Sequence, residues 1–203
     1  MKKIPLLFVT FFLAACAGGV KNSPAPTVFD FGVPSARLAS EATWTRLALE
    51  VKAPYWFDSL NIEYRLLYED SLRLREYAGS RWAGAPTQLL GQRLRQQLGV
   101  VAATGNTAVD CLLKLDLQEF SQVFDSPQQS RGLIQGSLAL IDGKRQTVAA
   151  RVLSIEQPAP TPDARGGVTA LVAAVDELGR QTAGWLAALD KSGELGNCRP
   201  GRR

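Results

Sequence analysis

Six stretches of this chain alternate apolar and polar residues with a period of two, the pattern of strands that bury one side and expose the other. In the first stretch, Leu47, Leu49 and Val51 share one face, while Glu50 and Lys52 point the other way. A turn around residues 69–71 and another at Asp142-Gly143 would join neighbouring strands into hairpins. The predicted strands are residues 47–52, 62–68, 72–75, 109–118, 134–140 and 148–155.

Two helices are predicted among these strands. The first begins at Pro86, carries a leucine stripe at four-residue spacing and stops before Gly99. The second runs from about Gly167 to Leu189 and keeps apolar residues at helical spacing throughout. The order βββ-α-βββ-α predicts a single α+β domain, with an antiparallel or mixed sheet of about six strands and two helices packed on one face.

The N-terminus reads as an export signal. Two lysines precede an apolar run, residues 4–13, that is too short to cross a bilayer, since a spanning helix needs about 20 residues. The run ends in Leu-Ala-Ala-Cys16, which resembles the lipobox of bacterial lipoproteins and predicts acylation of Cys16. An ordinary signal peptide with a chance cysteine is the alternative. Ala17 stands where an aspartate usually signals inner-membrane retention, so the outer membrane, facing the periplasm, is favoured.

The chain therefore divides into four expected parts. Residues 1–15 are the signal peptide, and residues 16–40, rich in small residues and proline, form the acylated N-terminus and a flexible tether. Within that tether, apolar residues 28, 29 and 31 suggest a short edge strand. Residues 41–190 are the folded domain and residues 191–203 a loose tail.

Composition excludes several classes of function. The formal net charge is +4, and cleavage would remove Lys2 and Lys3, so no nucleic-acid partner is indicated. The chain has no histidine, which removes the usual general base and the commonest metal ligand. No metal site, cofactor or enzymatic activity is expected.

Two cysteines remain besides Cys16. Cys111 and Cys198 would pair in an oxidising periplasm and pin the C-terminal tail to the sheet. Alternatively, Cys111 is simply a small buried residue of its strand.

Two groups of residues are candidates for partner binding. Tyr55 and Trp56 lie in an aromatic cluster beside a proline, and such residues are enriched at interaction hot spots. Arg65, Arg73 and Arg75 would line a wet sheet face together. The plainer readings are that the rings cap the end of the core, and that the charges are a solvated face with cross-strand pairs.

Two segments carry a resemblance to a known family. "RLALEVKAPYWFDSLNIEYRL" (residues 46–66) and "YAGSRWAGAPTQLLGQRLRQQLG" (residues 77–99) look like the ABC-type transport auxiliary lipoproteins, a PqiC-like family associated with MCE lipid transport systems. Phe57 stands where the family usually has a leucine. The likeness extends over roughly residues 45–190.

The resemblance implies a docking role for a lipoprotein held in the membrane by its lipid anchor. The expected partners are an MCE-domain protein and an ABC permease and ATPase complex that moves lipids between the two membranes. Two alternatives remain: an outer-membrane activator of a cell-wall synthase, and a lipid-binding carrier. The activator would need a tether of many tens of residues, whereas only about 24 residues separate Cys16 from the first confidently predicted strand here.

Overall fold

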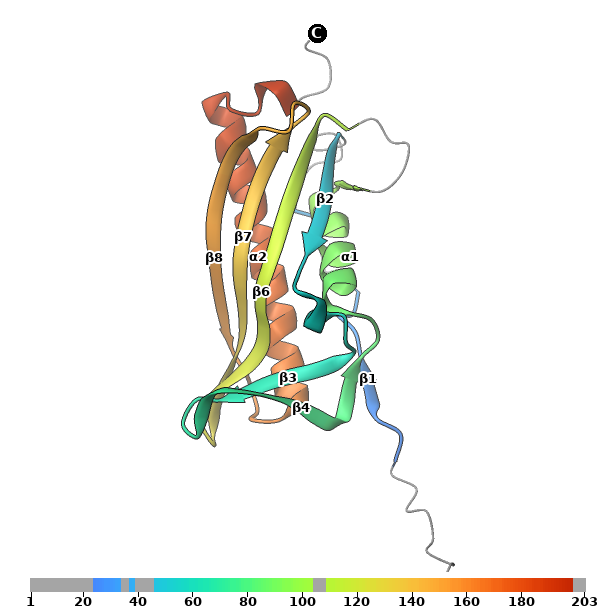
Figure 1. Cartoon of the computed structure of the whole chain (residues 1–203), viewed down its shortest axis with the longest axis vertical. Helices are drawn as coiled ribbons and strands as arrows, with labels where there is room; N and C mark the ends of the chain where they lie inside the picture. The colour runs from blue at the N-terminus through green and yellow to red at the C-terminus, as the bar shows by residue number, and fades with distance from the viewer. Residues whose placement is uncertain (1–23, 34–36, 39–45, 104–108, 199–203) are drawn as a thin grey trace, which may run out of the picture.

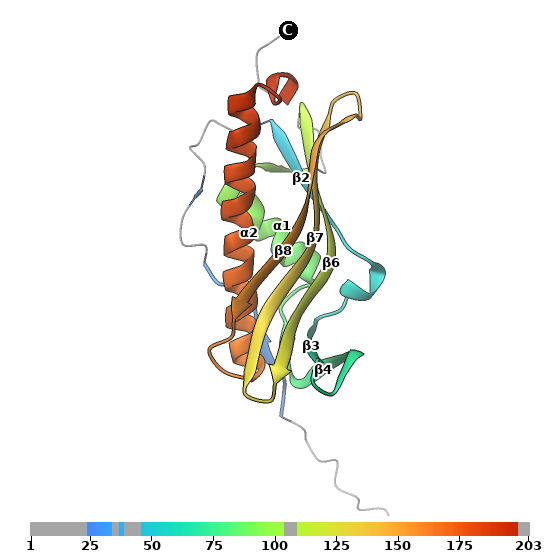
Figure 2. The ribbon, with the colours of Figure 1, turned by 90° about the vertical axis from the view of Figure 1, so that its left-hand side faces the viewer.

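The computed structural model describes residues 24–33, 37–38, 46–103 and 109–198. Within them, eight strands form one mixed sheet, and two helices pack side by side on one face of it (Figures 1 and 2). The expected α+β domain is confirmed, with two short strands beyond the predicted six. The elements are β1 (Thr27–Phe29), β2 (Leu47–Lys52), β3 (Asn61–Leu66), β4 (Asp70–Trp82), α1 (Pro86–Leu98), β5 (Val101–Ala102), β6 (Cys111–Ser126), β7 (Gln129–Asp142), β8 (Thr147–Pro158) and α2 (Ala164–Ser192), with short 3-10 helices η1 (Tyr55–Phe57) and η2 (Gly196–Cys198).

Strand β6 organises the sheet. One of its edges pairs with β7 in antiparallel fashion, and β7 pairs in turn with β8. The other edge is shared by two parallel neighbours, because β2 pairs with residues 111–116 and β3 with residues 122–124. A register shift between Leu117 and Glu119 separates these two partners. The β3–β4 hairpin therefore extends from one end of β6, beyond the part that pairs with β2 (Figure 1).

Both helices have clear end signals. Helix α1 has proline at its start and ends at Gly99, whose positive φ of 66° is easily adopted by glycine. Helix α2 begins earlier than predicted because the carboxylate of Asp163 accepts a hydrogen bond of 2.7 Å from the backbone N–H of Gly166. It ends at Gly193, again with positive φ, so residues 191 and 192 are helical and not part of the loose tail expected.

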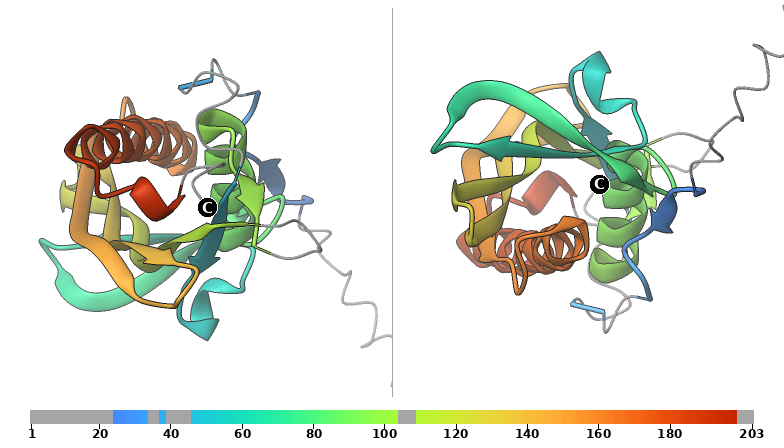
Figure 3. Two further views of the ribbon diagram at one scale, coloured as in Figure 1. Left: turned by 90° about the horizontal axis from the view of Figure 1, so that it is seen from above. Right: turned by 90° about the horizontal axis from the view of Figure 1, so that it is seen from below.

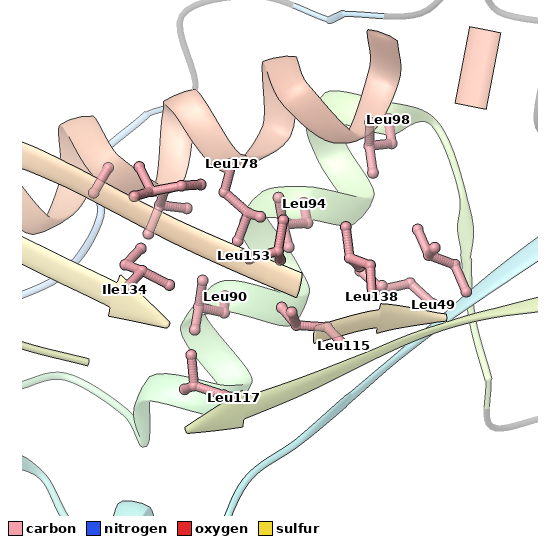
Figure 4. Packing of buried hydrophobic residues seen from close by; sticks show 14 of the residues in the cluster. Leu49, Leu90, Leu94, Leu98, Leu115, Leu117, Ile134, Leu138, Leu153 and Leu178 are labelled. Atoms are coloured by element: carbon pink, nitrogen blue, oxygen red, sulfur yellow. The ribbon is translucent and has the colours of Figure 1, made fainter. Parts of the chain in front are cut away.

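The hydrophobic core lies between the helices and the sheet. The leucine stripe of α1 meets apolar residues of α2, β2, β6 and β7, and the strands curve around the two helices (Figures 3 and 4). Helix α2 approaches β7 closely: a Cβ at Gly132 would lie 2.7 Å from the backbone nitrogen of Leu171. Glycine at this position therefore lets the helix lie directly against the strand.

Strand β1 confirms the edge strand suggested within the tether. It pairs in parallel with the end of β4, and Phe29 lies opposite Trp82. Phe31, two residues after the end of β1, is buried in the core. Folded structure thus starts well before residue 41.

The C-terminal end of the domain is joined to the sheet by a disulfide. Cys198 in η2 is bonded to Cys111 at the start of β6, with the two Cα atoms 5.3 Å apart. Leu195, just before η2, is buried. Residues 193–198 thus differ from the loose tail expected, because a buried leucine and a covalent bond hold them.

We expect loss of this disulfide to lower the free energy of unfolding by about 2–4 kcal/mol, because it closes a long loop in the unfolded chain. The two cysteines are 87 residues apart in sequence. Urea unfolding of the Cys111→Ala/Cys198→Ala variant measures the effect. A reducing agent should destabilise the native chain by a similar amount and leave the variant unchanged; equal stability of the two proteins would contradict the prediction.

Candidate partner-binding surfaces

The aromatic cluster after β2 is a single turn of 3-10 helix, not a strand. Backbone hydrogen bonds run from the N–H of Phe57 to the carbonyl of Pro54 and from the N–H of Asp58 to that of Tyr55. Consecutive side chains of a 3-10 helix are about 120° apart, so two neighbours can face solvent while a third faces inward.

In this turn, Tyr55 and Trp56 are 83% and 52% exposed, whereas Phe57 is buried. The two exposed rings meet edge to face, with their centroids 5.3 Å apart. The burial of Phe57 fills the core position expected of a leucine there. Tyr55 and Trp56 form the aromatic pair, a small exposed apolar surface at the end of β2.

The three candidate arginines do not form one patch. The register of the β3–β4 hairpin places Arg65 opposite Leu74, and Arg75 opposite Tyr64. Because side chains alternate between faces, Arg65 lies on one face of the hairpin, and Arg73 and Arg75 lie on the other. The prediction that they line one face together is therefore wrong, since sequence alone did not reveal the strand register.

Each face of the hairpin has its own ion pair. Arg65 bonds Glu119 of β6 at 3.0 Å, and Arg75 bonds Glu69 at 2.8 Å. Arg73 is exposed to solvent. The alternative interpretation, a solvated face with paired charges, therefore applies to Arg65 and Arg75.

Glu63 occupies an unfavourable position for a charged carboxylate. Burial raises its pKa from 4.5 to about 7, and repulsion by Glu119 adds to this, against the opposing effect of Arg65. Within the described residues, its Oε2 atom is buried without a hydrogen-bond partner. Glu63 stabilises the fold best when protonated.

We expect Glu63→Gln to raise the free energy of unfolding by about 2 kcal/mol at pH 8, and much less near pH 5. A pKa raised from 4.5 to about 7 corresponds to roughly 3 kcal/mol, which partial solvent access reduces. The pKa of Glu63 is higher in the folded than in the unfolded chain. Native Glu63 therefore contributes its full stability below pH 4.5, and that contribution is lost as the pH rises through 7. Urea unfolding at both pH values tests this, with Glu194→Gln as an exposed control that should show no such gain.

Two hollows in the described part have no predominantly apolar lining. One, of about 340 Å³, lies between the residues after β1 and helix α1, and Asp30, Gln92 and Arg93 line it. The other, of about 540 Å³, lies beside the β6–β7 turn, where Arg131 contacts Glu156. Sites for lipid chains are predominantly apolar, so neither hollow favours the carrier hypothesis.

The described residues offer no group of three or more histidine, cysteine, aspartate or glutamate side chains that could hold a metal ion. Among the same residues, no helix is both long and apolar enough to cross a membrane. The predicted signal peptide and Cys16 lie outside the described residues.

These features define a small α+β protein whose candidate sites are exposed binding surfaces. The chain belongs to the family of ABC-type transport auxiliary lipoprotein components, whose model matches residues 29–183. It is thus an auxiliary lipoprotein component of an ABC-type transport system. The family match begins inside β1, in agreement with the early start of folded structure.

Solved structures share this fold. A crystal structure of a protein from Xanthomonas campestris superposes with a TM-score of 0.66 at 19% sequence identity, over 82% of this chain and 98% of that one. A crystal structure of an uncharacterized protein gives a TM-score of 0.62 at 16% identity, over 80% and 99% of the two chains. At these identities the likeness concerns the fold alone. Comparison with curated proteins finds no match.

Proposed function

We propose that this protein is anchored in the outer membrane through Cys16 and docks the periplasmic MCE-domain protein of an intermembrane lipid transport system. The permease and ATPase of that system would lie in the inner membrane. The observation that carries the proposal is membership of the auxiliary lipoprotein family over most of the chain. The protein itself would act by binding, not by catalysis.

The position of β1 supports docking close to the membrane. Only ten residues separate Cys16 from Thr27, where β1 begins. Fully extended, this connection spans at most about 40 Å. The domain would thus be held near the lipid surface, which disfavours an activator that must reach a cell-wall synthase through the peptidoglycan.

The aromatic pair is the proposed contact with the MCE-domain protein. Tyrosine and tryptophan bury much apolar surface on binding and lose little conformational freedom, which makes them effective contact residues. Leu60, a third exposed apolar residue, follows shortly after the pair in sequence. Within the described residues, the side chains of Tyr55 and Trp56 make no hydrogen bond or ion pair, so replacing them should leave the fold intact.

Affinity capture of the tagged, acylated protein from gently solubilised envelopes tests the function. Co-purification of an MCE-domain protein, with its permease and ATPase, is the expected result. Recovery of a cell-wall synthase without any MCE-domain protein would overturn the proposal and favour the activator.

The same assay tests the contact residues. The Tyr55→Ala/Trp56→Ala variant should recover at least about tenfold less MCE-domain protein, as expected for hot-spot residues. Val152→Ala is the control, because Val152 on β8 is an apolar residue as exposed as Tyr55. Equal recovery with both variants would remove the aromatic pair from the interface.

A further inference from the structure

The turn of the β3–β4 hairpin exposes an unusual concentration of large apolar side chains. Leu72 is 89% exposed, and Leu67, Tyr68 and Leu74 are also exposed. We call these four residues the hairpin tip. Alternation predicted that Leu72 and Leu74 would be buried, but this part of the hairpin extends past the core that would cover them. Large apolar side chains exposed together around one turn mark an interaction site.

The hairpin tip is firmly built. The backbone N–H of Leu67 donates a hydrogen bond of 2.9 Å to the carbonyl of Phe124, at the end of β6. The N–H of Glu69 closes the turn onto the carbonyl of Leu66. The carboxylate of Asp70 accepts a bond of 3.0 Å from the N–H of Leu72. The apolar side chains are therefore held outward by a fixed backbone, not displayed by a loose loop.

The charges near the hairpin tip are largely used within it. Glu69 is paired with Arg75, and Asp70 bonds the backbone of the turn. Arg73, between the two exposed leucines, is left facing solvent. Leucine enters the acyl boundary of a bilayer, and tyrosine and arginine are stable at headgroup level. A turn that exposes these three residue types together therefore suits the interfacial region.

The hairpin tip and the start of the described chain lie at the same end of the molecule. In Figures 1 and 2, β1 and the β3–β4 hairpin occupy the lower end, opposite the C-terminus. β1 pairs with residues 80–82 of β4, whereas Leu72 of the hairpin tip lies up to about ten residues earlier on the same strand. At about 3.3 Å per residue, the two are at most about 35 Å apart. The connection from Cys16, at most about 40 Å long, therefore lets the hairpin tip reach the anchoring leaflet.

We propose that the hairpin tip inserts shallowly into the membrane leaflet that carries the acyl chains of Cys16. The inference rests on the lipid anchor of the proposed function. Two attachments, the acyl chains and the hairpin tip, fix the orientation of the domain relative to the membrane. The aromatic pair, which belongs to a different turn, is left for the MCE-domain protein.

Quenching of a tryptophan introduced into the full-length acylated protein tests the insertion. The protein is reconstituted in vesicles of phosphatidylethanolamine and phosphatidylglycerol with brominated acyl chains, which quench only nearby tryptophan. The variants are Leu72→Trp and, as control, Val152→Trp in the middle of β8. Both positions are more than four-fifths exposed, so a tryptophan fits without disturbing the fold.

Brominated lipid should reduce the added fluorescence of Leu72→Trp about twofold or more and leave that of Val152→Trp unchanged, because only the first ring enters the acyl boundary. Equal quenching of the two variants overturns the inference but leaves the anchor intact. A protein that does not float with the vesicles lacks the anchor, which overturns the proposed function as well. Fluorescence at position 72 that changes only when the MCE-domain protein is added would assign the hairpin tip to that partner and overturn membrane insertion.

Discussion

Replacing Asp176 with alanine should lower the free energy of unfolding by about 3–5 kcal/mol, because it would leave a buried guanidinium without its counter-ion. Arg93 of α1 is only 4% exposed and bonds both carboxylate oxygens of Asp176 on α2, at 2.9 and 3.0 Å. Gln97 donates a further bond of 2.7 Å to the same carboxylate. The pair thus joins the two helices at their contact. Urea unfolding monitored by circular dichroism measures the loss.

Two variants make this prediction specific. Glu177→Ala removes the neighbouring carboxylate, which pairs with Arg180 at the surface, and should cost less than about 1 kcal/mol. Arg93→Met combined with Asp176→Leu removes both charges and should recover most of the stability lost in Asp176→Ala. If Asp176→Ala costs no more than Glu177→Ala, the buried pair does not hold the helices together.

The sequence predicted the helices but not this contact between them. The leucine stripe of α1 identified its main buried face, and Arg93 and Gln97 lie off that stripe. In the structure, α1 also packs against α2, and this second contact buries both polar residues. Their partner, Asp176, lies about eighty residues further along the chain. The spacing of apolar residues within one helix cannot reveal a contact with a residue so far away in the sequence.

The alternation of apolar and polar residues located the strands well, because burial of one face produces this alternation within the sequence of each strand separately. It could not supply the sheet order. The sharing of one β6 edge by β2 and β3 depends on where the ladder shifts, near Leu117. That shift and the hairpin register decide that Arg65 lies apart from Arg73 and Arg75. The expectation of one arginine patch was wrong for this reason.

The candidate binding surfaces show the same limit. Composition identified Tyr55 and Trp56 as candidates, but only the 3-10 turn reveals that both face outward. The hairpin tip was missed altogether, because its alternation is indistinguishable from that of a buried strand. The apolar residues of such a strand are exposed only where no other part of the protein covers it. Which part is left uncovered depends on the whole fold. The tyrosine and leucines clustered around the turn were the only signal within the sequence.

Replacing Trp82 with alanine should lower the free energy of unfolding by about 3–5 kcal/mol, the cost of emptying a large aromatic site in a core. Trp82 is 1% exposed, at the end of β4. Its ring meets that of Phe31 edge to face at 5.4 Å and lies 5.9 Å from that of Phe120. The cavity would thus open between β4, β6 and the residues that follow β1. Thermal and urea unfolding measure the effect, with Trp56→Ala as the exposed matched control, expected to cost less than about 1 kcal/mol.

The same substitution should loosen β1, which has few other attachments. β1 is three residues long and pairs only along β4 in the described structure. Without the ring of Trp82, Phe31 loses its edge-to-face partner, and residues 24–33 should become sensitive to limited proteolysis before the rest of the domain unfolds. Release of β1 would lengthen the connection between Cys16 and the domain, and with it the range of distances from the membrane. If Trp82→Ala lowers stability but residues 24–33 stay as protease-resistant as in the native chain, the ring of Trp82 does not hold β1 in place and does not set the length of the tether.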